Sequence, residues 1–197
     1  GTATLRRRAR VLPSQDVTIE AGAGPVRVAP VTLLLHKPAG LRWEDAAPLL
    51  VPANLLASPG APALLPRHLS GQQCMTPLDA AASGLVIFTQ EWRVERKLRE
   101  DAPYIEHEVM VDVAGPVEPR VLVQLDRLPA RVSIGRQDAQ RTGLRFAVKG
   151  LAPGQIASQC ERAGLDIEAM KRIRIGRIPL AGLPPGQWRY LLPSEKV

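Results

Sequence analysis

The first strand is predicted over residues 31–36, where VTLLLH is almost wholly apolar, as a buried strand is. The KPAG that follows ends this strand, because Pro and Gly interrupt strands. Further short runs predict strands at 84–89, 108–113, 132–134, 144–148 and 187–191. A polar loop centred on RQDAQRTG is predicted to join the fourth and fifth of these six strands.

Three other segments have the pattern of helices. Residues 91–100 place apolar side chains among charged ones, as a surface helix does. Residues 117–125 are predicted as a second helix. Residues 153–163 are predicted as a third, because Pro is favoured in a first turn and Gly164 stands where a C-terminal cap belongs. Residues 41–66 are rich in Pro and Ala, which predicts short helical turns inside a long connection.

Residues 172–175 alternate between arginine and isoleucine within MKRIRIGRI. Side chains alternate between the faces of a strand, so Ile173 and Ile175 are predicted on one face, Arg172 and Arg174 on the other. Strands and helices are interspersed without a regular βαβ rhythm. The predicted class is therefore α+β, with a mixed or antiparallel sheet and helices against it.

A chain of 197 residues suffices for one sizeable core or two small lobes. Residues 1–30 look incomplete as a domain: they hold a basic cluster, RRRAR, and two short strand-like pieces without a helix. They are expected to be an N-terminal remnant or linker. Two interpretations stay open, a solvated tail and the end of an RNA-binding module.

The charge balance favours a polyanionic partner. Lys and Arg number 26 against 19 Asp and Glu, giving a net charge of +7 and a pI near 10.1. Aromatic residues are only 4%, so charge and shape rather than stacking would carry most RNA binding. No apolar run is long enough to span a membrane or to form a signal peptide, so a cytoplasmic protein is expected.

The sequence contains no recognisable motif for binding a metal or a cofactor. Cys74 and Cys160 form no metal spacing or disulfide framework, and His36, His68 and His107 are scattered. Phosphate loops and nucleophile elbows are also absent. We expect neither a metal nor a cofactor.

One carboxylate remains as a candidate catalytic group. Asp79 lies in CMTPLDAAASGLVIFTQ, just ahead of a predicted buried strand. An aspartate before three alanines is also a good N-cap of a short helical turn, and from the local sequence alone this interpretation is favoured.

Five ordered motifs then resemble the Rsu/Rlu family of bacterial RNA pseudouridine synthases. The matching stretches span roughly residues 31–192: LLLHKPAG, TPLD with GLVIFTQ, EHEVMV, G with QI and its helix, and RIRIG with GQWR. The resemblance implies the pseudouridine synthase fold over 31–197, a mainly antiparallel mixed sheet flanked by helices, with a central cleft. It further implies a cytoplasmic monomer that isomerises uridine in structured RNA, most plausibly ribosomal RNA, without metal or cofactor.

The resemblance assigns Asp79 as the catalytic carboxylate, kept ionised by a neighbouring guanidinium and facing a flipped nucleotide. It places Lys37, Val109, Gln155, Arg172 and Arg174 among the substrate-binding residues. For Lys37, a structural role in the loop after the first strand stays open. For both arginines, solubilising charge on an edge strand competes with RNA phosphate contact.

Three positions depart from the family pattern. Pro77 replaces an arginine that helps to hold the RNA, and Val109 replaces a tyrosine that packs on the uracil. Ala157 stands where the family has a basic residue that pairs with the aspartate, so Arg145, Arg172 and Arg174 are the candidates for its place. An active synthase and a catalytically impaired RNA-binding relative are therefore both open.

Overall fold

The computed structural model describes residues 28–125 and 130–196. The predictions made for residues 1–27, including the basic cluster and most of the strand-like pieces, lie outside this part of the chain. Within it, no helix is long and apolar enough to cross a membrane.

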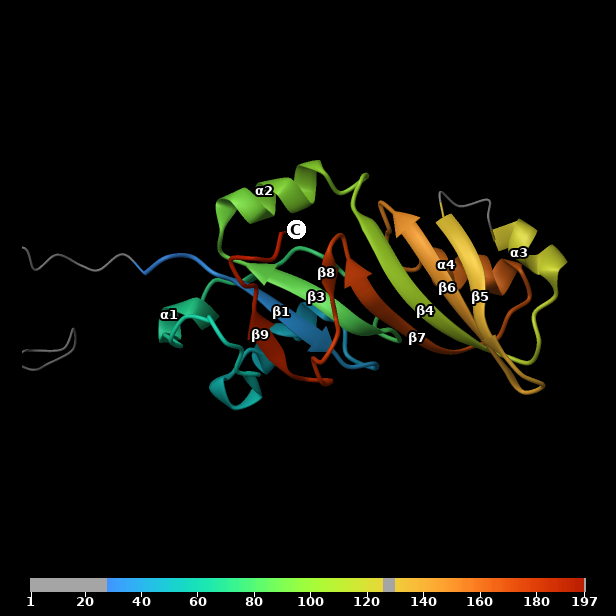
Figure 1. Cartoon of the computed structure of the whole chain (residues 1–197), viewed down its shortest axis with the longest axis horizontal. Coiled ribbons are helices and arrows are strands. Elements are labelled where there is room, and N and C mark those ends of the chain that lie inside the picture. The colour runs from blue at the N-terminus through green and yellow to red at the C-terminus, as the bar shows by residue number, and fades with distance from the viewer. Residues whose placement is uncertain (1–27, 126–129, 197) are drawn as a thin grey trace, which may run out of the picture.

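One mixed sheet runs the length of the molecule (Figure 1). Its main strands follow the order β5-β6-β4-β7-β3-β1-β9, while β2 pairs with β3 and β8 with β7. The strand bounds are β1 Thr32–Lys37, β2 Gln73–Cys74, β3 Ser83–Thr89, β4 Glu106–Ala114, β5 Ala130–Gln137, β6 Arg141–Lys149, β7 Ile167–Ile175, β8 Ile178–Pro179 and β9 Trp188–Tyr190. The predicted α+β class is confirmed.

The short helices lie against this sheet. Their bounds are α1 Pro66–Leu69, α2 Trp92–Glu100, α3 Pro119–Leu125 and α4 Gln155–Arg162. Figure 1 places α2 over the β1–β3 end, α4 behind β5 and β6, and α3 beside β5 at the right-hand edge. The three predicted helices are confirmed, with later starts or earlier ends than expected.

The half of the sheet formed by β1, β3 and β9 is covered on both faces. On one face, Leu34, Leu85 and Ile87 belong to an apolar cluster with Leu98 of α2. The other face is covered by the connection predicted over 41–66, which contains three short 3-10 helices, Trp43–Asp45, Ala47–Leu49 and Pro52–Asn54.

Two hydrogen bonds fasten this connection to β9. The Trp188 indole donates to the Val51 carbonyl at 2.9 Å, and the Leu56 amide donates to the Trp188 carbonyl at 2.7 Å. Because Trp188 is fully buried, the connection is part of the core rather than a free loop.

The half formed by β4, β5, β6 and β7 has one covered face and one open face. Val109, Val111 and Phe146 face the main apolar cluster, which also holds Ile156 and Cys160 of α4.

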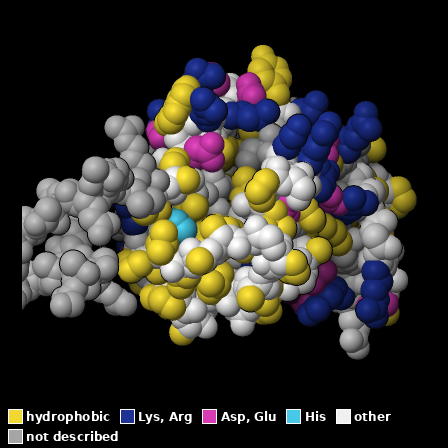
Figure 2. Space-filling model, turned by 60° about the vertical axis from the view of Figure 1, so that its left-hand side comes forward, with side chains coloured by type: hydrophobic (Ala, Val, Ile, Leu, Met, Phe, Trp, Pro, Cys, Tyr) yellow, Lys and Arg dark blue, Asp and Glu magenta, His cyan; other side chains and the backbone are white. Residues whose placement is uncertain are grey.

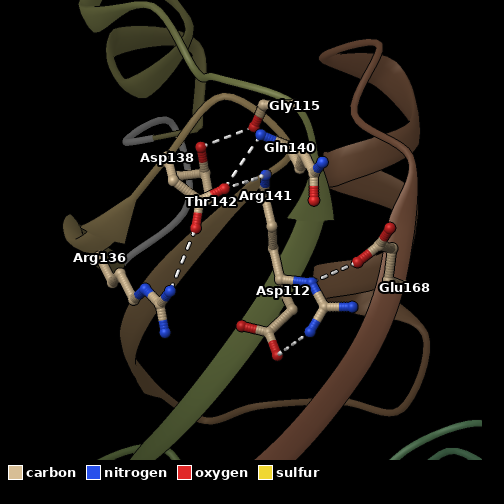
Figure 3. Close-up of polar contacts among 8 residues, drawn as sticks. All are labelled: Asp112, Gly115, Arg136, Asp138, Gln140, Arg141, Thr142 and Glu168. Carbon is tan, nitrogen blue, oxygen red and sulfur yellow. Dashed lines mark hydrogen bonds and ion pairs between the residues drawn. The ribbon is translucent and has the colours of Figure 1, made fainter.

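The strands here are longer than predicted, and the predicted polar loop is mostly strand. Only residues 138–140 separate β5 from β6, and Asp138 closes that turn by accepting hydrogen bonds from the Gln140 and Arg141 amides (Figure 3).

On the open face, charged side chains pair across the strands. Arg141 of β6 reaches Glu168 of β7 at 2.5 Å and Asp112 of β4 at 4.0 Å (Figure 3). Such exposed pairs contribute little stability each, but they keep an uncovered sheet face polar.

The two halves meet at a short parallel pairing between β3 and β7, which joins Ser83 to Lys171 and Gly84 to Arg172. Gly84 has φ +126°, and a Cβ added there would overlap the backbone of Arg172. The close approach of the two backbones therefore requires glycine at this position.

The prediction that both arginines of RIRI share one face is wrong. On β4, Glu108 pairs with Arg174 and Val109 with Arg172, so Ile173 is an extra residue at a bulge. Neighbouring residues on β4 point to opposite faces, and the two arginines do so as well. Nor is β7 an edge strand, since β4 and β3 flank it.

Candidate active site

Asp79 lies in the loop between β2 and β3, immediately before the strand that joins the two halves of the sheet. Leu78 and Ala82 on either side are buried in the main apolar cluster, while Asp79 itself is half-buried. The apolar neighbours fix the loop, and the carboxylate between them keeps access to solvent.

Lys37 anchors this loop from the end of β1. Its side chain is fully buried, and Nζ donates hydrogen bonds to the carbonyls of Pro38 at 2.9 Å, Leu41 at 2.6 Å and Ala80 at 3.3 Å. The Gly40 amide also donates to the Ala80 carbonyl, at 2.8 Å. An ammonium has three protons, so these bonds account for all of its donors. Lys37 therefore holds the residue that follows Asp79.

Arg172 of β7 anchors the same loop from the other side. Its guanidinium is buried and donates to the carbonyls of Thr76 at 2.6 Å, Pro77 at 3.0 Å and Leu85 at 2.7 Å. One side chain thus bonds to the chain both before and after Asp79. It also spans the seam between the two halves of the sheet.

Burial lowers the pKa of both Lys37 and Arg172, and the negative charge of Asp79 acts to raise it. Burial lowers the pKa of Lys37 to about 8, Arg172 lowers it too, and Asp79 acts against both. Burial lowers the pKa of Arg172 to about 10, and the charges of Cys74 and Asp79 oppose this. At neutral pH both side chains remain positive. Asp79 is therefore flanked by two fixed positive charges.

The capping interpretation of Asp79 is wrong. Residues 80–82 form no helix, and the contact at this turn is made by the Asp79 backbone carbonyl, which accepts from the Ala82 amide at 3.1 Å. Within residues 28–125 and 130–196, the Asp79 carboxylate takes part in no hydrogen bond or ion pair. Its oxygens are free to meet a ligand.

Of the three arginines considered as partners of Asp79, only Arg172 bonds to its loop. Arg174 is half-buried and bonds to Glu106 at 2.5 Å and Glu108 at 2.7 Å. Arg145 pairs with Glu108 as well. The hydrogen bond from the Arg145 guanidinium has the largest effect on the pKa of Glu108, and it lowers this pKa. Burial acts in the opposite direction, and Arg174 lowers the pKa further. Arg145 and Arg174 thus belong to a charge network on β4, β6 and β7.

Val109 lies in the core with residues of the Asp79 loop, and Gln155 begins α4. Val109 is buried in the apolar cluster that contains Leu78, Ala82 and Ile156. Gln155 opens α4, and its side-chain oxygen accepts a hydrogen bond from the Ala152 amide at 3.1 Å. Gln155 therefore shapes the loop before α4.

A cavity of about 380 Å³ opens next to the Asp79 loop, although none of the predicted site residues, Asp79 included, lines it. Thr76 and Pro77 form part of its wall, together with the end of α2, the start of β4 and the segment Gly150–Pro153. His107 of β4 also lines it. His107 could not be singled out from the sequence, because an isolated histidine carries no spacing signal. The clue to it is its place in β4, where it takes the covered position that Val109, Val111 and Val113 take further along the strand.

The chain resembles known pseudouridine synthases in sequence. It is 25% identical over 126 residues to the dual-specificity RNA pseudouridine synthase RluF of Escherichia coli K12, covering 61% of this chain and 43% of RluF. It is 25% identical over 195 residues to the chloroplast protein SVR1 of Arabidopsis thaliana, whose name places it with the pseudouridine synthases of the large ribosomal subunit; 86% of this chain and 46% of SVR1 are covered. The chain spans less than half the length of these curated relatives.

Its fold is also that of solved pseudouridine synthases. A crystal structure of a pseudouridylate synthase matches with a TM-score of 0.64 at 18% identity, over 84% of this chain and 72% of that one. The archaeal box H/ACA Nop10–Cbf5 complex matches with a TM-score of 0.52 at 15% identity, over 76% of this chain and 48% of that one. The chain matches no protein-family model. The pseudouridine synthase fold predicted from the motifs is confirmed.

Proposed function

Because the chain is a divergent relative of the pseudouridine synthases in sequence and fold, we propose that it isomerises uridine to pseudouridine in RNA. Asp79 is the catalytic carboxylate in this proposal. The observation that carries it is the state of Asp79: a carboxylate without a hydrogen bond to residues 28–125 and 130–196, in a loop held by two buried cations.

The reaction needs an ionised carboxylate and an extruded nucleotide. Asp79 attacks the base or the ribose, and the bond between the ribose and N1 of the uracil breaks. The uracil turns over, C5 bonds to the ribose carbon in place of N1, and the bond that Asp79 formed breaks, which releases the carboxylate. The C5 proton is lost and N1 ends protonated, so atoms balance without an oxidant, a metal or a cofactor. Lys37 and Arg172 position the carboxylate through the loop and supply positive charge beside it.

RNA is the partner that the charge favours, with a net charge of +7 for the chain. Figure 2 shows Lys and Arg side chains gathered along the upper and right-hand parts of one face, beside a broad area of apolar and uncharged surface. Exposed cations include four on α2 and five on the β5–β6 hairpin: Arg93, Arg96, Lys97, Arg99, Arg131, Arg136, Arg141, Arg145 and Lys149. Ribosomal RNA, the substrate class in the name of SVR1, is the proposed target of a cytoplasmic monomer.

A second function has one observation in its favour. Pro77, Val109 and Ala157 stand where the family has side chains that contact RNA or pair with the aspartate, and none of the three offers a side-chain donor. A relative that binds RNA through its basic surface without turnover would keep the fold and tolerate these changes.

A map of pseudouridines in total RNA from the source cell separates the two functions. In cells carrying Asp79→Asn, we expect one or a few sites to lose modification by about 10³-fold, with RNA affinity unchanged. Asp45→Asn, at an exposed aspartate that pairs with Arg42, is the matched control and should leave every site intact. If all sites persist in Asp79→Asn while the protein still binds ribosomal particles, the chain is a binding protein.

A further inference from the structure

The cavity beside Pro77 is walled mainly by apolar side chains. Met75 and Leu98 line it from the β2 loop and α2, Ile105 from the start of β4, and Leu151 from the loop before α4. Among residues 28–125 and 130–196, none of those that line it is charged. A phosphate or another anion would find no counter-charge inside, whereas an uncharged group of moderate size would fit.

His107 is the polar group at the edge of this apolar space. Its side chain is 7% exposed, and Nδ1 is buried without a hydrogen-bond partner among residues 28–125 and 130–196. A buried polar atom without a partner is costly, and such atoms in native proteins are usually satisfied by water or a ligand. The other ring nitrogen, Nε2, is not buried and has no hydrogen-bond partner among these residues, so it can bond to a group that enters the cavity.

The ring is also neutral. Burial lowers the pKa of His107 to about 3, and the positive charges of Arg172 and Arg174 act in the same direction. A neutral imidazole presents one donor and one acceptor. Nε2 can act as either one, depending on the tautomer, so it suits an uncharged polar group with apolar faces on either side, and a nucleobase has this form.

We propose that the cavity lined by Met75, Leu98 and His107 binds a second unpaired base of the RNA, close to the one that reaches Asp79. The proposal rests on the proposed function for its RNA. Thr76 and Pro77 connect the two places, because they line the cavity and also accept the hydrogen bonds of Arg172 that hold the Asp79 loop. A base bound here contributes affinity and selects the sequence around the modified uridine.

The test is a titration of the ¹⁵N-labelled full chain with adenosine, guanosine, cytidine and uridine, followed through the imidazole nitrogens. At millimolar concentration, at least one nucleoside should move the His107 signals. His36, bonded to the Leu183 carbonyl, and His68, bonded to Tyr190, should stay in place as internal controls. His107→Leu keeps the volume and removes the hydrogen bond, so binding followed by backbone signals should weaken about tenfold.

Ala152→Trp, at an exposed position on the rim of the cavity, should block binding without changing His107. No movement of His107 with any nucleoside, or equal binding by His107→Leu, would overturn the proposal. Asp79→Asn separates this test from the proposed function. If it keeps nucleoside binding while every pseudouridine persists in cells, the synthase assignment fails and the base site stands. If it loses nucleoside binding, the nucleoside lies at Asp79 and the base site is wrong.

Discussion

The two halves of the sheet are covered differently. Every residue of β1, and every residue of β3 after Ser83, is buried, because α2 covers one face and the 41–66 connection the other. In β5 and β6, by contrast, exposed residues alternate with covered ones along much of each strand, since only the face toward α3 and α4 is covered. The first half is buried on both faces, whereas the second half is buried on one apolar face and exposed on the other.

The joint between these halves is short, and the candidate site lies on it. β3 and β7 share only two residue pairs, whereas β4 pairs with β6 along nine. The Arg172 guanidinium, which bonds to three carbonyls of the first half, supplements that short pairing. We therefore expect the geometry of the candidate site to depend on how well the two halves are held together.

A substitution that forces β3 and β7 apart at the joint should have the largest effect on stability. Gly84→Ala adds a Cβ into the backbone of Arg172 at a φ that disfavours alanine, so β3 and β7 would have to separate. We expect destabilisation of more than about 4 kcal/mol or loss of cooperative folding, measured by urea unfolding.

The control is Gly115→Ala, at the end of β4. Gly115 has a positive φ of +72°, but nothing lies within 4 Å of an added Cβ. It should cost only about 1–2 kcal/mol, from backbone strain alone. Similar losses for the two variants would show that the joint is not tightly packed.

Removing the bridging guanidinium should cost less but remain large. Arg172→Met leaves the carbonyls of Thr76, Pro77 and Leu85 without their donor in a buried place, and we expect about 3–5 kcal/mol of lost stability. The matched variant is Arg174→Met, two residues along the same strand. Glu108 keeps Arg145 there, so about 1–2 kcal/mol is expected. Equal losses in denaturant unfolding would contradict a special role for Arg172.

The same contrast explains what the sequence could predict of the fold. The strands covered on both faces were placed to within a residue, because an unbroken apolar run has no other stable place than a core. β5 and β6 were predicted too short, because strand residues on an open face are as polar as a loop. The bulge at Ile173 left no signal in the alternation of RIRI, since pairing with β4 creates it.

The site was predicted in its carboxylate but not in its surroundings. Asp79 followed from a resemblance of ordered motifs. The partners of its loop did not, because Lys37 and Arg172 act through backbone carbonyls, and any sequence supplies those. Arg172 and Arg174 look equivalent in the sequence, and only the pairing with β4 separates a buried bridge from a partly exposed ion pair.

The smallest expected effect concerns the second half alone and depends on pH. Burial, with help from Arg172 and Arg174, lowers the pKa of His107 from 6.5 to about 3. Below pH 6.5 the unfolded chain therefore takes up a proton that the folded chain refuses, so stability is present above pH 6.5 and is lost as the pH falls toward 3. Between pH 7 and pH 5 this loss amounts to about 2 kcal/mol in the native chain and is missing in His107→Leu.

The buried His36, whose pKa burial also lowers, is common to both proteins, so its contribution cancels in the comparison. Urea unfolding of the two proteins at both pH values checks this, and parallel losses would mean that His107 has the same pKa in the folded and unfolded chains.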